Sequence, residues 1–141
     1  MFVKHHYYSN NAQLKKLPAI VEGRSRNAAY FASRFAENDR VAIQNENGES
    51  SWLGFSLIIT DKLLDRNEVG HGLTRARIEC RPIVSGNFVQ NDVIRFFNWS
   101  TAGKLSVSDV VHDRGFFVGN SQNDLTSEID HLVRIIKEIK E

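Results

Sequence analysis

Apolar and polar residues follow two different spacings in this chain, one typical of helices near both ends and one typical of strands between them. Near the start, apolar side chains recur every three or four positions after Ser25, which is a favourable helix-capping residue. A shorter helix is expected before it, and Pro18 ends that helix because the residue before a proline disfavours helical backbone. Residues 2–8 are expected to form a short strand ahead of both helices. The apolar positions of the second helix are Ala28, Phe31, Ala32 and Phe35.

The middle of the chain alternates apolar and polar residues, which is the spacing of a strand with one buried face. Turn sequences such as Asn47-Gly48 and Ser85-Gly86-Asn87 separate the alternating segments. Because short turns join successive strands, the segments predict an antiparallel meander. The predicted strands are 40–44, 51–60, 73–84, 93–99, 105–111 and 116–118.

The last twenty residues give the strongest helical pattern. Their apolar positions are Leu125, Ile129, Leu132, Ile136 and Ile139, with spacings of four, three, four and three. Ser121 or Asn123 is available as the N-cap, and acidic residues precede basic ones, which suits the helix dipole. The same spacing permits an intermolecular coiled coil. Val133 and Ile135 widen the apolar stripe, however, and this favours packing onto the core.

Together these elements predict an α+β fold, in which an antiparallel meander sheet of five to six strands is covered by short N-terminal helices and a long C-terminal amphipathic helix. The order resembles the helix-grip arrangement, in which a curved sheet folds around a terminal helix and leaves a ligand cavity between them. With 141 residues, no repeat and no linker composition, residues 1–141 are expected to form a single domain.

Charge and cysteine content narrow the setting in which the protein works. Eighteen basic and 17 acidic side chains leave a net charge of +1, so no protein-wide field attracts nucleic acid. The single cysteine, Cys80, cannot form an internal disulfide and fits a reducing compartment. There is no apolar signal-peptide region and no run of 18 apolar residues. A cytoplasmic protein without membrane contact is expected.

Candidate chemistry is sparse in this sequence. No two histidines stand three or four residues apart, so no metal site is predicted. Residues 100–105 resemble a phosphate-binding loop, but Asn98 and Leu105 occupy positions that require glycine and Ser or Thr. No cofactor and no catalytic set are therefore predicted. His71 and His112, each in a predicted turn, are the weak candidates for an enzyme site if the fold brings them together.

The clearest functional pattern is a row of arginines on the predicted strand 73–84. Arg75, Arg77 and Arg81 fall on one face of that strand, with Glu79 between them. Arg95 on the following strand extends the row, and Trp99 offers a stacking surface. Arginine and aromatic side chains on an open sheet suit binding to a protein or to single-stranded nucleic acid. The alternative is a solvated face that acids on neighbouring strands neutralise.

These observations favour a small non-enzymatic binding module that contacts a protein partner, such as an accessory, inhibitor or immunity-type factor. One alternative is a ligand-binding helix-grip domain, and another is a nucleic-acid-binding protein that uses the arginine face. An enzyme built on His71 and His112 is the last alternative. The sequence does not indicate an oligomeric state.

Overall fold

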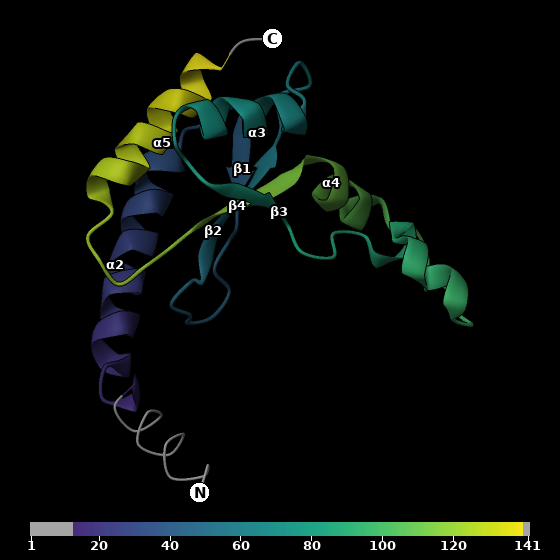
Figure 1. Ribbon diagram of the computed structural model, residues 1–141, viewed down its shortest axis with the longest axis horizontal. Coiled ribbons are helices and arrows are strands. Elements are labelled where there is room, and N and C mark those ends of the chain that lie inside the picture. The colour runs from purple at the N-terminus through teal and green to yellow at the C-terminus, as the bar shows by residue number, and fades with distance from the viewer. Residues whose placement is uncertain (1–12, 140–141) are drawn as a thin grey trace, which may run out of the picture.

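A computed structural model describes residues 13–139, which form one antiparallel sheet with helices packed around it. The strands are β1 (Val41–Ile43), β2 (Gly54–Ile59), β3 (Cys80–Pro82) and β4 (Gly115–Gly119), in the spatial order β1-β2-β4-β3. The helices are α2 (Leu17–Phe35), α3 (Arg66–Arg75), α4 (Ser106–Arg114) and α5 (Thr126–Glu138). In Figure 1, α2 and α5 run along one side of the sheet, α3 lies across its end, and α4 lies on the other side.

The core lies between the sheet and the pair α2 and α5. Alternation along β2 buries Phe55, Leu57 and Ile59 on one face, as the sequence predicts. The Phe31 ring of α2 stacks on the Phe55 ring with centroids 4.3 Å apart. Ile136 of α5 is also fully enclosed. The terminal helix is therefore part of the core, as its apolar stripe predicts.

A buried polar network fastens α2 to the segment that leads into α5. The Asn27 side-chain amide donates to the Asn120 side chain at 3.2 Å and to the Asn123 carbonyl at 2.7 Å. Asn120 in turn donates to the Trp52 carbonyl at 3.0 Å. A Cβ atom on Gly23 would lie 2.2 Å from a backbone oxygen of this segment, so glycine permits the close approach.

Two arginines that the sequence pattern does not single out connect distant parts of the backbone. Arg40 donates at 2.7 Å to the carbonyls of both Ile136 and Ile139, so it satisfies the C-terminal end of α5. Arg114 donates at 2.8 Å to the Ile59 carbonyl. Both guanidinium groups thus serve the fold by satisfying backbone oxygens.

The predicted sheet has two strands too many, and a third predicted strand is much shorter in the structure. Residues 66–75 form α3, so only Cys80–Pro82 of the predicted strand 73–84 is extended. Residues 106–114 form α4 instead of a strand, and residues 93–99 contain part of a 3₁₀ helix. β4 already has β2 and β3 on its two sides, which leaves no free edge beside it for another strand.

The beginning of the described chain also differs from the prediction. One continuous helix covers Leu17–Phe35, and Pro18 lies in its first turn instead of ending a helix before it. Proline is tolerated there because its missing N–H needs no partner in the first turn. The predicted strand over residues 2–8 lies outside the described residues. Between residues 13 and 139, no helix is long and apolar enough to cross a membrane.

The connection between β3 and α4, residues 83–105, is called the arm. It contains two short 3₁₀ helices, η1 (Phe88–Gln90) and η2 (Asp92–Phe96), and no residue of either helix is buried. Figure 1 shows the arm projecting past α4, away from α2 and α5. It is the part of the described chain that extends farthest from the sheet on that side.

Candidate functional site

The predicted row of arginines does not form. Arg75 ends α3, Arg77 follows it with a left-handed backbone (φ 61°), and Arg81 alone lies on β3. Arg95 and Trp99 lie on the arm. The two-residue spacing thus spans a helix end, a turn and a strand, which point their side chains in different directions. Each of the five residues remains a separate binding candidate.

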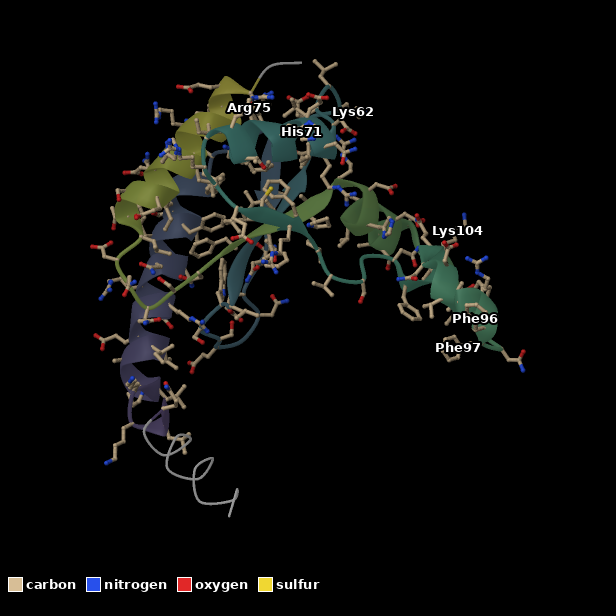
Figure 2. All side chains as sticks on the ribbon, in the orientation of Figure 1. Lys62, His71, Arg75, Phe96, Phe97 and Lys104 are labelled. Atoms are coloured by element: carbon tan, nitrogen blue, oxygen red, sulfur yellow. The ribbon has the colours of Figure 1, made fainter. Side chains whose placement is uncertain are left out.

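One groove collects most of the chemically useful side chains between α3 and β3. It has a volume of about 200 Å³. Its lining comes from α3 (Arg66, Asn67, Gly70, His71, Thr74), from β3 (Cys80, Arg81, Pro82) and from Phe116 of β4. The α3 residues Asn67, His71 and Thr74 are spaced four and three apart and therefore share one helical face. Figure 2 labels His71 and Arg75 on this helix.

Two guanidinium groups reach the groove from different elements. Arg66, at the start of α3, donates to the carbonyl of His112 on α4. Arg81 donates to the Glu79 carboxylate through Nε at 3.1 Å and Nη2 at 2.7 Å, and both side chains are mostly exposed. Such an exposed pair is weak and is screened by salt. The lining residues themselves carry positive charge and no carboxylate, so the groove suits an anionic ligand.

The thiol in this groove is unsuited to nucleophilic chemistry. Cys80 is half-buried, and burial together with the neighbouring Glu79 charge raises the pKa of its thiol. A raised pKa reduces the thiolate fraction at neutral pH, and the thiolate is the nucleophile. Cys80 therefore serves as packing at the groove wall, against the hydrophobic core.

The two candidate histidines do not share a site. His71 lines the groove, whereas His112 accepts a hydrogen bond at Nδ1 from the backbone N–H of Asn87 at 3.3 Å. The Asn87 side chain donates to Asp109 at 2.7 Å, so His112 and Asp109 hold the base of the arm. Within residues 13–139, no group of three His, Cys, Asp or Glu side chains is placed to hold a metal ion.

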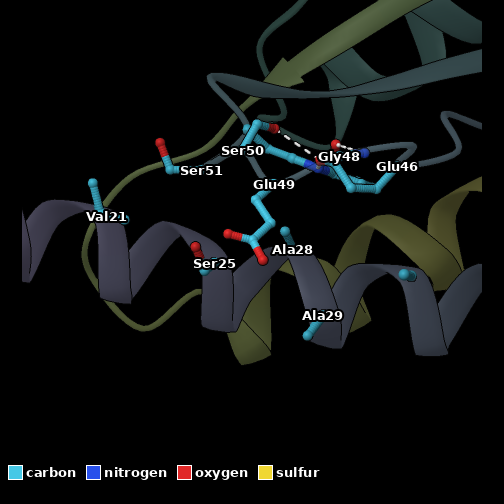
Figure 3. A pocket seen from close by; sticks show the side chains of 11 residues that line it. Val21, Ser25, Ala28, Ala29, Glu46, Gly48, Glu49, Ser50 and Ser51 are labelled. Atoms are coloured by element: carbon cyan, nitrogen blue, oxygen red, sulfur yellow. Dashed lines mark hydrogen bonds between the residues drawn. The ribbon is translucent and has the colours of Figure 1, made fainter.

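A second, more open groove runs along α2. It has a volume of about 880 Å³, and Figure 3 shows the small side chains of α2 facing the loop between β1 and β2. In that loop Glu46 accepts hydrogen bonds from the Ser50 hydroxyl at 2.8 Å and from Trp52 Nε1 at 2.5 Å. These bonds, the Ser50 bond first, lower the pKa of Glu46. The two hydrogen bonds order the loop, and they leave the Glu46 carboxylate already engaged within the protein.

The cavity expected for a helix-grip fold is small. A pocket of about 250 Å³ lies between α5 and the adjoining ends of β3 and β4 and is open to the surface. Ile129 and Leu132 line this pocket, and elsewhere Val133 and Ile136 are buried between α5 and the rest of the fold.

The capping signal of α3 is the feature that sequence reasoning missed. Asp65 accepts a hydrogen bond from the Asn67 N–H at 2.7 Å, and Glu68 stands three residues after it. An acidic cap followed three residues later by Glu is a helix-start signal. That signal would have placed Asn67, His71 and Thr74 on one helical face, which is the α3 wall of the groove.

Comparison with known proteins identifies clear relatives. Residues 10–137 match the model of the DegT/DnrJ/EryC1/StrS aminotransferase family. The chain is 44% identical over 127 residues to a GDP-4-keto-6-deoxy-D-mannose 3-dehydratase of Yersinia pseudotuberculosis, and 42% identical to the protein of that name from Escherichia coli O55:H7. These alignments cover 89% of this chain but only 32% and 33% of the relatives. The chain thus spans about a third of the length of the curated relatives it matches.

Solved structures agree with this result. The E. coli dehydratase with bound hydrated PLP superposes with a TM-score of 0.85 at 42% identity, over 89% of this chain and 33% of that structure. A Helicobacter pylori aminotransferase involved in the biosynthesis of pseudoaminic acid superposes with a TM-score of 0.75 at 15% identity, over 91% of this chain and 34% of that chain, and it shares the fold.

These relatives correct the functional expectation drawn from the sequence. They are enzymes, so the interpretation as a non-enzymatic accessory, inhibitor or immunity-type module is wrong. The helix-grip and nucleic-acid alternatives are withdrawn with it. Because the chain spans about a third of the length of these enzymes, their catalytic residues need not lie within it.

Proposed function

This chain belongs to the DegT/DnrJ/EryC1/StrS aminotransferase family, and we propose that it forms one structural unit of an enzyme that dehydrates a nucleotide-linked 4-keto-6-deoxy sugar at carbon 3. The observation that carries this proposal is the high identity to two such dehydratases over nine-tenths of the chain. The aminotransferase structures have much lower identity, so they support the fold and not the reaction. Because the relatives are three times longer, the activity is proposed for an assembled enzyme.

The described residues do not fit a complete site for pyridoxal phosphate, the PLP of the E. coli structure. Such a site needs a partner for the ring nitrogen and commonly a lysine that forms a Schiff base. The α3–β3 groove has arginines that suit a phosphate, but its lining contains neither a carboxylate nor a lysine. All five lysines between residues 13 and 139 are exposed. We therefore assign cofactor binding to the part of the enzyme that lies outside this chain.

The α3–β3 groove suits a different task, which is to hold the anionic part of the substrate. In a nucleotide-linked sugar, a diphosphate joins the nucleoside to the sugar that reacts. Arginine guanidinium groups match phosphate oxygens in a bidentate geometry, and Arg66 and Arg81 approach the groove from two elements. The exposed Arg81–Glu79 pair is weak enough for a phosphate to compete with it.

A chimera tests the proposed function. In it, this chain replaces the matching third of the E. coli dehydratase, and consumption of GDP-4-keto-6-deoxy-D-mannose is measured with PLP present. The chimera is expected to consume the sugar, and the isolated chain is not. A folded chimera that binds PLP, seen by its absorbance, but leaves the sugar unchanged contradicts the proposal.

The groove is tested in the same chimera. Arg66→Gln and Arg81→Gln are expected to raise KM about tenfold or more with a smaller change in kcat, because they remove substrate binding. Arg26→Gln is the matched control, since Arg26 is exposed on α2 and does not line the groove. An unchanged KM in both groove variants would contradict the assignment of the diphosphate to this groove.

A further inference from the structure

The arm carries a concentration of exposed apolar side chains that nothing in the described chain covers. Phe96 is 79% exposed, Phe97 59% and Trp99 51%. In Figure 2, Phe96 and Phe97 lie at the outer end of the arm, away from the sheet and the long helices. Scattered apolar residues are ordinary on a protein surface, but a cluster of large aromatic residues marks an interaction surface. Val84 and Phe88 elsewhere on the arm, and Val107 on the adjoining α4, are also exposed.

The arm is nevertheless built as an ordered element. At its base Gly86 has a left-handed backbone (φ 45°), and a Cβ atom there would lie 2.6 Å from Nδ1 of His112. Asn87 is buried, and its side chain donates to Asp109 at 2.7 Å. Gln90 donates to the same carboxylate at 2.6 Å. The base is therefore fixed to α4 by hydrogen bonds that a floppy loop would not make.

The outer half of the arm supports its own backbone. The Asn87 side chain accepts from the N–H of Val89 at 3.2 Å, and the Asn91 side chain accepts from the N–H of Val93 at 3.1 Å. Each of these bonds caps one of the two 3₁₀ helices. Local hydrogen bonds thus hold the aromatic residues outward without help from a hydrophobic core.

The arm carries few charged side chains, which are Asp92, Arg95 and Lys104. Arg95 pairs with Asp92 at 3.0 Å, and its guanidinium carbon lies 5.8 Å from the centre of the Phe96 ring. Two basic side chains against one acidic side chain leave little net positive charge on the arm, and a phosphate backbone binds through several positive charges. The exposed surface is therefore apolar and aromatic, which is the composition of a protein interface.

We propose that the outer arm, with Phe96, Phe97 and Trp99 as anchors, docks onto the two-thirds of a family enzyme that this chain does not contain. The occupant follows from length, because the curated relatives are about three times as long as this chain and therefore supply a large surface that is absent here. The inference rests on the proposed function only in taking that enzyme as the partner. It also gives the predicted protein contact at Arg95 and Trp99 a specific location.

The first experiment measures association without any reaction. The 141-residue chain is mixed with the E. coli dehydratase from which the matching third has been removed, and binding is followed by sedimentation. The double variant Phe96→Ser and Phe97→Ser is expected to weaken binding about tenfold or more, because buried aromatic anchors dominate interfaces. The control Leu53→Ser removes an equally exposed apolar side chain (78%) from the β1–β2 connection and is expected to bind normally. Equal binding by the arm variant and the wild type, or equal loss in the control, overturns the proposal.

The second experiment does not require the truncated enzyme to fold alone. Trp52 is buried and Trp99 is exposed, so iodide quenching of tryptophan fluorescence in this chain reports mainly on Trp99. In the chimera, the tryptophans that come from the E. coli enzyme are replaced by Phe. Trp99 is then expected to be shielded from iodide. Quenching equal to that of the isolated chain overturns the proposal. Shielding of the isolated chain that grows with its concentration also overturns it, and assigns the surface to a second copy.

The two readouts also separate this inference from the proposed function. A chimera that shields Trp99 but does not dehydrate the sugar contradicts the proposed function and leaves the docking surface standing. A chimera that dehydrates the sugar while Trp99 stays open to iodide contradicts the docking surface alone.

Discussion

The body of the molecule and its arm place their large aromatic side chains in opposite ways, although each buries a hydrogen-bonded asparagine. In the body, α2, α5 and the sheet bury Phe31 and Phe55 against each other, and buried Asn27 is hydrogen-bonded on both its amide nitrogen and oxygen. In the arm, Asn87 is buried at the base, whereas Phe96 is directed outward. The body is therefore stabilised by its own buried core, whereas local hydrogen bonds hold the arm in its shape.

This contrast teaches how exposed aromatic residues should be interpreted in a chain that spans about a third of the length of its relatives. If the aromatic residues were exposed only because the arm is a flexible loop, the arm would lack hydrogen-bonded helix caps and a fixed base. The arm has both, so its aromatic surface is positioned for contact. Mutations in the two regions should then differ in what they change: stability in the body and association in the arm.

The largest expected difference is between two phenylalanines. Phe31→Ala should lower the free energy of unfolding by about 3–5 kcal/mol, because a fully buried ring is replaced by a cavity. Phe97→Ala in the arm should change it by no more than about 0.5 kcal/mol. Urea denaturation of the isolated chain measures both. A large loss at Phe97 would mean that the arm packs onto the body.

A smaller difference is expected between two asparagines. Asn27→Ala should cost about 1–3 kcal/mol, because it leaves the buried Asn120 side chain and the partly buried Leu125 N–H without this partner. The control is Asn98→Ala, since Asn98 is exposed on the arm. Thermal melts of the two variants should separate clearly. Equal melting temperatures would show that water replaces the Asn27 hydrogen bonds at no cost.

The smallest effect concerns acid stability of the body. The Leu63 N–H and then Arg40 donate to the Asp61 carboxylate, and they hold the pKa of Asp61 below its ordinary value. A lower pKa in the folded state stabilises the fold above the unfolded pKa of about 3.9, and this stability is lost as the pH falls through the folded pKa. Asp61→Asn should therefore reduce the fall in melting temperature that the wild type shows as the pH is lowered. The melting temperature is measured as a function of pH, and the same pH dependence in both proteins would contradict the role of this carboxylate.

Local pattern was sufficient where one face of an element meets the core along its whole length. The stripe that contains Ile129, Leu132 and Ile136 predicted α5, and alternation at Phe55 and Leu57 predicted the buried face of β2. The helix begins at Thr126 rather than directly after the predicted caps, because Asp124 accepts the hydrogen bond from the Thr126 N–H at 3.0 Å.

Pattern misled where an alternating segment is not covered on one face. Val107 and Val110 are exposed on α4, so their apolar character did not report a buried strand face. The arginines from Arg75 to Arg81 alternate in sequence, but the chain passes from helix through a left-handed turn to a strand within those residues. The groove needs α3 and β3 side by side, and sequence spacing contains no information about that contact.

By itself the sequence determined the burial of α5 and β2 and the α+β class. Only the tertiary structure decided which strands pair, that β4 lies between β2 and β3, and that Arg66 and Arg81 line one groove. The physical reason is the distance along the sequence between the residues that make the contacts. Periodicity records which side of one element avoids water, whereas pairing and sites depend on contacts such as Arg40 to Ile136, which join residues 96 positions apart.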